Sequence, residues 1–294
     1  MRRCSVLWVL PFVSALMGCG LALPTGKASP LTPGTTPLVQ ARKAHPTQLT
    51  QRGPSPQQYD QEVPPGVERV TFGRSGLFAW IARPAGAGPH PAVLWAHGGF
   101  ALGAGDFEDV RPFVNAGFVV MTPAWRGENG NPGSFEMYYG EVDDACDALN
   151  YLAKLREVDP RHLYVAGHSA GGTVAALTAE SSPRVKAAAA VGATADLRGA
   201  VERFRQPLFE GTPYDWRNTA ENDLRSPARH LNDLRCPLAL YYGSEERDLI
   251  AIARPMEQYA GTLGKTVTLE VIPGTDHFGA VGPAVQKMIA VFSR

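Results

Sequence analysis

The chain has 294 residues, of which 44% are hydrophobic and 19% charged, a composition typical of a globular protein with one large domain. Its 28 basic side chains equal its 28 acidic ones, so no basic surface for nucleic acid is expected, and we exclude a nucleic-acid partner. The four cysteines form no Cys-x-x-Cys pair and no cluster with histidine, which excludes a zinc site of the usual spacing. We expect Cys146 and Cys236 to be reduced core residues.

The first residues have the pattern of an export signal. Two arginines at positions 2 and 3 precede an apolar run over residues 6–16, which is too short to span a bilayer. Residues 16–19, Leu-Met-Gly-Cys, resemble the lipobox of bacterial lipoproteins. The resemblance implies that residues 1–18 are removed as a signal peptide and that Cys19 is acylated, which would anchor the protein in the cell envelope. Gly20 in place of an aspartate implies the outer membrane; the alternative is an ordinary signal peptide with an unrelated cysteine.

Residues 19–66 have the composition of a linker. Nine prolines and many threonines occur between residues 24 and 65, with few large apolar side chains. Such a segment cannot bury enough apolar surface to offset the entropy that it would lose on ordering. We therefore expect a disordered, extended tether between a membrane and a folded domain over residues 67–294.

From residue 67 onward, apolar runs of strand length alternate with stretches of helical periodicity. The expected strands cover residues 67–72, 77–83, 91–96, 118–122, 163–166, 185–191, 237–242 and 266–272. The expected helices cover residues 107–116, 138–156, 172–180, 256–263 and 283–292. Strands that are buried on both faces and separated by helices predict an α/β protein with a mostly parallel central sheet and helices on both faces. Ligand sites of such sheets lie beyond the carboxyl ends of the strands.

The pentapeptide Gly-His-Ser-Ala-Gly at residues 167–171 stands at one of those strand ends. It follows a short buried strand and precedes a helix rich in small residues, as the Gly-x-Ser-x-Gly nucleophile elbow does. The flanking glycines would allow a strained turn that exposes the serine hydroxyl. The pattern alone also fits an ordinary glycine-serine turn. Ser169 is the candidate nucleophile.

A serine hydroxyl needs a base to take its proton, and the base is usually a histidine oriented by a carboxylate. In hydrolases with this elbow the chain order is serine, acid, histidine. Only His230 and His277 follow Ser169. His277 lies in a glycine-bounded loop after the strand expected over residues 266–272, so we take it as the base. His230 lies in a connecting segment and has the pattern of a structural residue, and His168 is expected to pack within the elbow.

The acid is expected after the strand over residues 237–242, where the loop holds three carboxylates. Counted from the glycine that ends the strand, Glu246 stands at the usual position. Counted back from the following helix, Asp248 stands there. The sequence leaves both open, and we favour Asp248.

The oxyanion of acyl transfer needs preorganised N–H donors. One candidate is the backbone N–H of Ala170, directly after the nucleophile. The other comes from the loop His97-Gly98-Gly99-Phe100, a His-Gly-Gly motif after the strand at residues 91–96, in which Gly99 and Phe100 are the candidate donors.

Taken together, these motifs resemble those of the catalytic domain of the prolyl oligopeptidase (S9) family and its serine-esterase relatives. The resemblance covers residues 67–294. It rests also on the Arg-Gly-x-x-Gly loop at residues 125–130, the helix at 143–152 and the Val-Asp-Pro-Arg motif at 158–161. The segment at 226–238, which leads into the strand before the expected acid, adds to it. One departure is His97, which stands where some members carry a tyrosine.

The resemblance implies an α/β-hydrolase fold and a serine hydrolase that works through an acyl-enzyme, without cofactor or metal. Because the chain before residue 67 is too short for the family's propeller domain, small carboxylic esters are favoured as substrates over short peptides. The alternatives are an S9-like peptidase and an inactive hydrolase fold that serves as a surface binding protein. Residues 196–233 carry four large aromatic side chains and are expected either to cap the site or to pack on the sheet.

Overall fold

The computed structural model describes residues 31–60 and 62–294. The expected signal peptide and Cys19 lie outside the described residues. Within residues 31–60 and 62–294, no helix is both long enough and apolar enough to cross a membrane.

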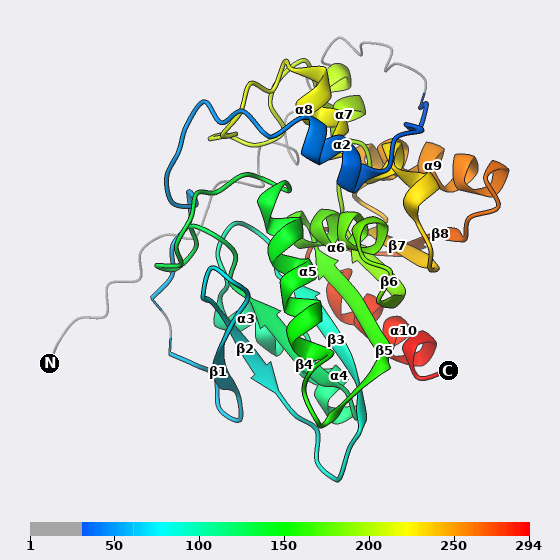
Figure 1. Cartoon of the computed structure of the whole chain (residues 1–294). Coiled ribbons are helices and arrows are strands. Elements are labelled where there is room, and N and C mark those ends of the chain that lie inside the picture. Colours follow the sequence, from blue (N-terminus) through cyan, green and yellow to red (C-terminus); the bar gives the residue numbers. More distant parts are fainter. Residues whose placement is uncertain (1–30, 61) are drawn as a thin grey trace, which may run out of the picture.

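The centre of the molecule is an eight-stranded sheet (Figure 1). Its strands are β1 (Glu68–Phe72), β2 (Leu77–Ala82), β3 (His90–Ala96), β4 (Val119–Pro123), β5 (Val158–His168), β6 (Val185–Val191), β7 (Leu238–Gly243) and β8 (Val267–Ile272). The spatial order is β1-β2-β4-β3-β5-β6-β7-β8, so β8 is the last strand at one edge. The pairs β1–β2 and β2–β4 are antiparallel, and every other neighbouring pair is parallel. The predicted fold class, an α/β-hydrolase fold with a mostly parallel sheet, is confirmed.

Helices cover both faces of this sheet. The helices of the described residues are α2 (Leu38–Ala44), α3 (Ala104–Glu108), α4 (Arg111–Asn115), α5 (Gly140–Leu152), α6 (Ala170–Ser181), α7 (Leu197–Phe204), α8 (Thr219–Asp223), α9 (Arg247–Thr262) and α10 (Val281–Phe292), with two 3₁₀ turns at Pro227–Arg229 and Leu231–Asp233. Helices α5 and α6 pack together on one face, and α4 and α10 pack together on the other. The helix expected over residues 107–116 is two short helices, because Pro112 begins a new turn in α4.

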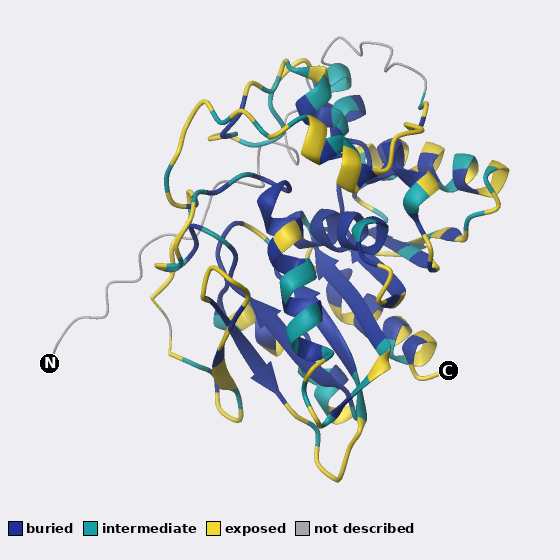
Figure 2. Ribbon diagram, in the orientation of Figure 1, coloured by how far each residue is buried: buried dark blue, intermediate teal, exposed yellow. Residues whose placement is uncertain are grey.

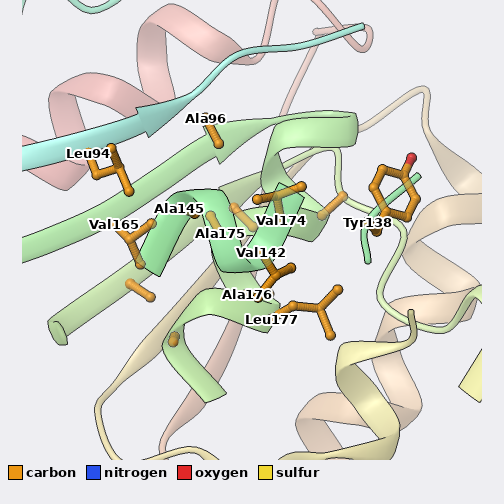
Figure 3. Close-up of a cluster of buried hydrophobic side chains, with 14 of the residues drawn as sticks. Leu94, Ala96, Tyr138, Val142, Ala145, Val165, Val174, Ala175, Ala176 and Leu177 are labelled. Atoms are coloured by element: carbon orange, nitrogen blue, oxygen red, sulfur yellow. The ribbon is translucent and has the colours of Figure 1, made fainter. Parts of the chain in front are cut away.

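Each face of the sheet has its own hydrophobic core. Along β3, Leu94 and Ala96 point into the core under α5 and α6, whereas Val93 and Trp95 point into the core under α4 and α10. Figure 3 shows the first core, in which strand residues face small and branched side chains of α5 and α6. The interior strands are buried almost throughout (Figure 2), which explains why their sequences are continuous apolar runs.

The prediction of a disordered tether over residues 19–66 is wrong for residues 31–60. This segment contains α2, and the Leu38 side chain is completely buried beneath the helix. The guanidinium of Arg42 is also buried and donates to the carbonyl oxygens of Tyr138, Tyr139 and Leu224 at 2.8–2.9 Å. Composition does not predict this folding, because a few buried side chains with several contacts each offset the entropy cost of ordering without a large apolar content.

Residues 196–233, here called the cap segment, contain α7, α8 and the two 3₁₀ turns, with α2 beside them (Figure 1). That this segment covers the site stays a prediction. The amino-terminal segment is joined to this cap by a β-bridge between Leu49 and Tyr214. Arg225 is fully buried there, paired with Glu221 and stacked on the Tyr214 ring at 3.9 Å. Of the four cap aromatics, Phe209 contacts the expected oxyanion loop, with its ring 5.1 Å from that of Phe100.

Candidate active site

Ser169 occupies a strained turn between β5 and α6. Its backbone has φ +54° and ψ −118°, a conformation that residues other than glycine rarely adopt. The Ser169 N–H donates to the carbonyl of Val191 at the end of β6, 2.7 Å away. A methyl group at Gly167 or Gly171 would overlap the carbonyl of Ala96, so both flanking positions require glycine. The turn thus has the geometry of a nucleophile elbow and leaves the serine half-buried at the carboxyl ends of the strands.

His277 and Glu246 form a close buried pair near this turn. Nδ1 of His277 lies 2.6 Å from Oε1 of Glu246, and both side chains are almost fully buried. The second carboxylate oxygen, Oε2, accepts the N–H of Gly243 at 2.6 Å. Glu246 follows β7 and His277 follows β8, so adjacent parallel strands deliver the two side chains to the same edge. A carboxylate at Nδ1 fixes the imidazole tautomer and leaves Nε2 for proton transfer.

The structure corrects the preference for Asp248 as the acid. Asp248 lies in the first turn of α9, half-exposed, and its Oδ1 accepts from Nη2 of Arg203 in α7 at 3.0 Å. The alternative acid, Glu246, is the residue that contacts His277. Asp276, next to the base, accepts the N–H groups of Phe278 and Gly279 and so caps its own loop.

Two neighbours hold the imidazole of His277 in place. Gly192, with φ +60°, lies against the ring, and a Cβ at this position would come within 2.7 Å of Cε1. Nε2 of His168 lies 3.0 Å from the carbonyl oxygen of His277. Burial and the adjacent His277 lower the pKa of His168 to about 3, so His168 is neutral and can donate this hydrogen bond from Nε2. Gly192 was not predicted from the sequence, where its one signal is a glycine directly after the β6 strand.

The expected oxyanion residues lie together. Ala170, Gly99 and Phe100 line one pocket beside the elbow, of about 230 Å³ including the space at its mouth. The rest of its wall is mainly apolar and consists of Trp125, Glu128, Phe135, Tyr138, Glu141, Gly171 and Val174. The Tyr138 hydroxyl is buried and has no hydrogen-bond partner among the described residues. Phe100 does not present a free N–H, because that group donates to Oε1 of Gln57 at 2.8 Å. Gln57 belongs to the segment with the composition of a linker, residues 19–66.

A buried ion pair supports the oxyanion loop. Nε2 of His97 lies 2.9 Å from Oε2 of Glu128, and Nδ1 lies 2.9 Å from the carbonyl of Gly98. Burial alone would lower the pKa of His97, but the Glu128 carboxylate outweighs it and raises the pKa to about 9. Oε2 of Glu128 also accepts the N–H of Trp125, which ties the Arg-Gly-x-x-Gly loop to the His-Gly-Gly loop. His97 is therefore charged at neutral pH and stabilises the His-Gly-Gly loop through its contact with Glu128.

The described residues contain no group of three or more histidine, cysteine, aspartate or glutamate side chains that could hold a metal ion. His230 is buried in the cap, where its Nε2 lies 3.0 Å from the carbonyl of Asp223. This contact within the cap segment fits the predicted structural role of His230.

Comparison with known proteins gives relatives of two activities. The chain is 25% identical over 183 residues to an uncharacterised peptidase of Bacillus subtilis, covering 58% of this chain and 68% of the relative. It is 25% identical over 203 residues to an acetyl esterase of Xylanibacter ruminicola, covering 58% of this chain and 46% of the relative. Among solved structures, an acylaminoacyl peptidase of Pyrococcus horikoshii superposes with a TM-score of 0.66 at 15% identity, over 78% of this chain and 41% of the peptidase.

This chain therefore spans less than half the length of that esterase and that peptidase. The structural likeness supports the fold, and the family is established by sequence. The model of the prolyl oligopeptidase family matches residues 106–291, which include the elbow, Glu246 and His277. With this match and the hydrolase sheet, the chain belongs to the prolyl oligopeptidase family and has its α/β-hydrolase catalytic fold.

Proposed function

We propose that the protein is a serine hydrolase that cleaves carboxylic esters of small molecules through an acyl-enzyme. The observation that carries the proposal is the 2.6 Å contact between Nδ1 of His277 and Oε1 of Glu246, beside the strained turn of Ser169. A buried histidine held by a carboxylate on one nitrogen is the arrangement that activates a serine hydroxyl.

In the proposed reaction the hydroxyl oxygen of Ser169 attacks the ester carbonyl carbon, and Nε2 of His277 takes the hydroxyl proton. Glu246 stabilises the imidazolium that forms. The oxyanion accepts hydrogen bonds from the N–H of Ala170 and from the Gly99–Phe100 loop. His277 then returns the proton to the alcohol oxygen as the carbon–oxygen bond breaks. Water releases the acid from Ser169 by the same steps in reverse.

One observation favours esters over peptides. The pocket beside the oxyanion residues is narrow and mainly apolar, which suits a small acyl group. The acetyl esterase and the peptidase relatives are each 25% identical to this chain, so the relatives do not choose between the two substrate classes. Peptidase activity remains the competing proposal, because the family and the relatives include peptidases.

The test is turnover of p-nitrophenyl acetate and covalent labelling by a fluorophosphonate, in the wild type and in Ser169→Ala. We expect both signals in the wild type and neither in the variant. A panel of aminoacyl p-nitroanilides separates the alternatives, since faster turnover of the anilides than of the esters would favour the peptidase. Failure of the wild type to react with any of these reagents would support an inactive binding protein instead.

We also propose that the protein is exported and anchored in the outer membrane through Cys19. The lipobox-like phrase at residues 16–19 supports this proposal. Cys19→Ser is expected to move the protein from the membrane fraction to the soluble fraction of the producing cells. A variant that stays with the membranes would contradict the anchor.

A further inference from the structure

The segment from Gly53 to Tyr59, here called the strap, lies against the oxyanion side of the candidate site. Ser55 is its buried anchor: its N–H donates to the carbonyl of Gly127 at 2.9 Å, and its hydroxyl donates to the carbonyl of Phe100. Gln58 adds a hydrogen bond from Nε2 to the same Gly127 carbonyl at 2.8 Å. These contacts fix the strap backbone to the two loops that border the pocket.

Further contacts hold the two ends of the strap. The carbonyl of Gly53 accepts the N–H of Phe135 at 3.0 Å, and the N–H of Tyr59 donates to Oδ1 of Asn129 at 2.7 Å. Phe135 is itself a pocket residue. The strap therefore lies behind residues that line the pocket, although it precedes the first strand of the sheet in the chain.

Between these anchors, Gln57 reaches the oxyanion loop. Its side-chain carbonyl oxygen, Oε1, accepts the N–H of Phe100 at 2.8 Å. The same oxygen lies so close to Gly99 that a Cβ there would come within 2.8 Å of it. An amide carbonyl oxygen is the same kind of acceptor as the carbonyl oxygen of an ester, and the single hydrogen of Phe100 N cannot serve both fully. Gln57 therefore occupies the N–H group that the His-Gly-Gly motif predicts as an oxyanion donor.

We propose that the strap is an autoinhibitory element in which Gln57 occupies an oxyanion donor of the resting enzyme. This inference rests on the proposed serine-hydrolase function. Rotation of the half-buried Gln57 side chain frees Phe100 N, while Ser55 and Gln58 keep the strap backbone in place. Because a neutral hydrogen bond contributes little net free energy, the contact slows the enzyme on the order of two- to tenfold and does not abolish activity.

The experiment uses the full chain with three substitutions and follows both the rate of fluorophosphonate labelling and kcat/KM for p-nitrophenyl acetate. Gln57→Ala removes the competing acceptor and is expected to raise both rates about two- to tenfold. Gln57→Glu replaces it with a carboxylate, which accepts a hydrogen bond more strongly and repels the oxyanion, so both rates should fall. Gln51→Ala is the matched control, because Gln51 lies exposed in the same segment and should leave both rates unchanged.

The outcomes separate this inference from the proposed function. If the wild type is labelled and Gln57→Ala leaves the labelling rate unchanged or lowers it, the autoinhibitory role of the strap is refuted. The proposed serine-hydrolase function then still stands. Absence of labelling in the wild type and in all three variants would overturn both. Labelling of Gln57→Ala alone would support both. Thermal unfolding midpoints close to that of the wild type verify that each variant is folded.

Discussion

At the residue scale, the choice between Glu246 and Asp248 depends on where α9 begins. The helix starts at Arg247, so Glu246 is the last residue of the loop and turns inward to His277. Asp248 lies one residue inside the helix and faces Arg203 at the surface. Counting from the end of the strand gives Glu246, and counting back from the helix gives Asp248. Residue types alone do not say where the helix begins, so the sequence could not decide between them.

Replacement of Glu246 by glutamine should therefore damage the reaction, while replacement of Asp248 by asparagine should not. Glu246→Gln keeps the size of the side chain but removes the charge that stabilises the imidazolium, so we expect kcat to fall on the order of 10²–10⁴-fold. Asp248→Asn is the matched control and should stay within about twofold of the wild type, since it loses one exposed ion pair. The measurement is p-nitrophenyl acetate turnover, and a larger defect in Asp248→Asn would refute the assignment.

The pair of His97 and Glu128 makes stability depend on pH. The pKa of His97 is about 9 in the folded protein, above its ordinary value of 6.5. The stabilisation is therefore fully present below about pH 6.5 and is lost as the pH rises through 9. Burial raises the pKa of Glu141 from 4.5 to about 7, so Glu141 changes the pH dependence of stability mainly below pH 7.

Between pH 7 and pH 9 the free energy of unfolding should thus fall by on the order of 2 kcal/mol in the wild type. His97→Gln can still donate to Glu128 but does not titrate, so its unfolding free energy should change less over the same range. Urea unfolding at a series of pH values measures both slopes. Equal slopes in the two proteins would show that His97 does not carry the charge.

At the scale of elements, α2 shows how a segment of linker composition can become part of a fold. Leu38 fills a fully buried position, whereas its neighbour Val39 is 44% exposed. We expect Leu38→Ala to lower the free energy of unfolding by about 2–5 kcal/mol, and Val39→Ala by less than about 0.5 kcal/mol. Chemical denaturation of the two variants measures the difference. A similar small effect in both would mean that α2 does not stay docked in solution.

The long, regular elements were predictable because periodicity and burial agree along them. The strands at 185–191 and 266–272, and the helix at 283–292, occur within a residue or two of their predicted limits. The strand before the elbow was predicted too short, over residues 163–166, whereas β5 begins at Val158 and includes Asp159 and Pro160. Contacts between distant segments, such as Gln57 with Phe100 and Gly192 with His277, leave no periodic pattern in the sequence.

At the scale of the whole molecule, the sheet order explains why most of the site could be predicted. The elbow follows β5, the acid follows β7 and the base follows β8, so their order along the chain becomes a row along one edge of a parallel sheet. The sequence carries that order and hence the nucleophile and base candidates. The packing of residues 31–60 against the cap segment and the oxyanion loop cannot be predicted in this way. It depends on the contacts of single side chains, such as Arg42 and Gln57.

The position of β8 at the sheet edge has a consequence for how the enzyme loses activity. β8 pairs only with β7, and its exposed and half-exposed residues make it the least protected strand beside the site. Local opening of such an edge costs less free energy than global unfolding. In rising urea, ester hydrolysis should therefore disappear at a lower concentration than the far-ultraviolet circular dichroism of the sheet, because the loop with His277 detaches first. Coincident transitions would show that the edge and the core unfold as one cooperative unit; separate ones would make the loop that holds His277 the first part of the native state to be lost under stress.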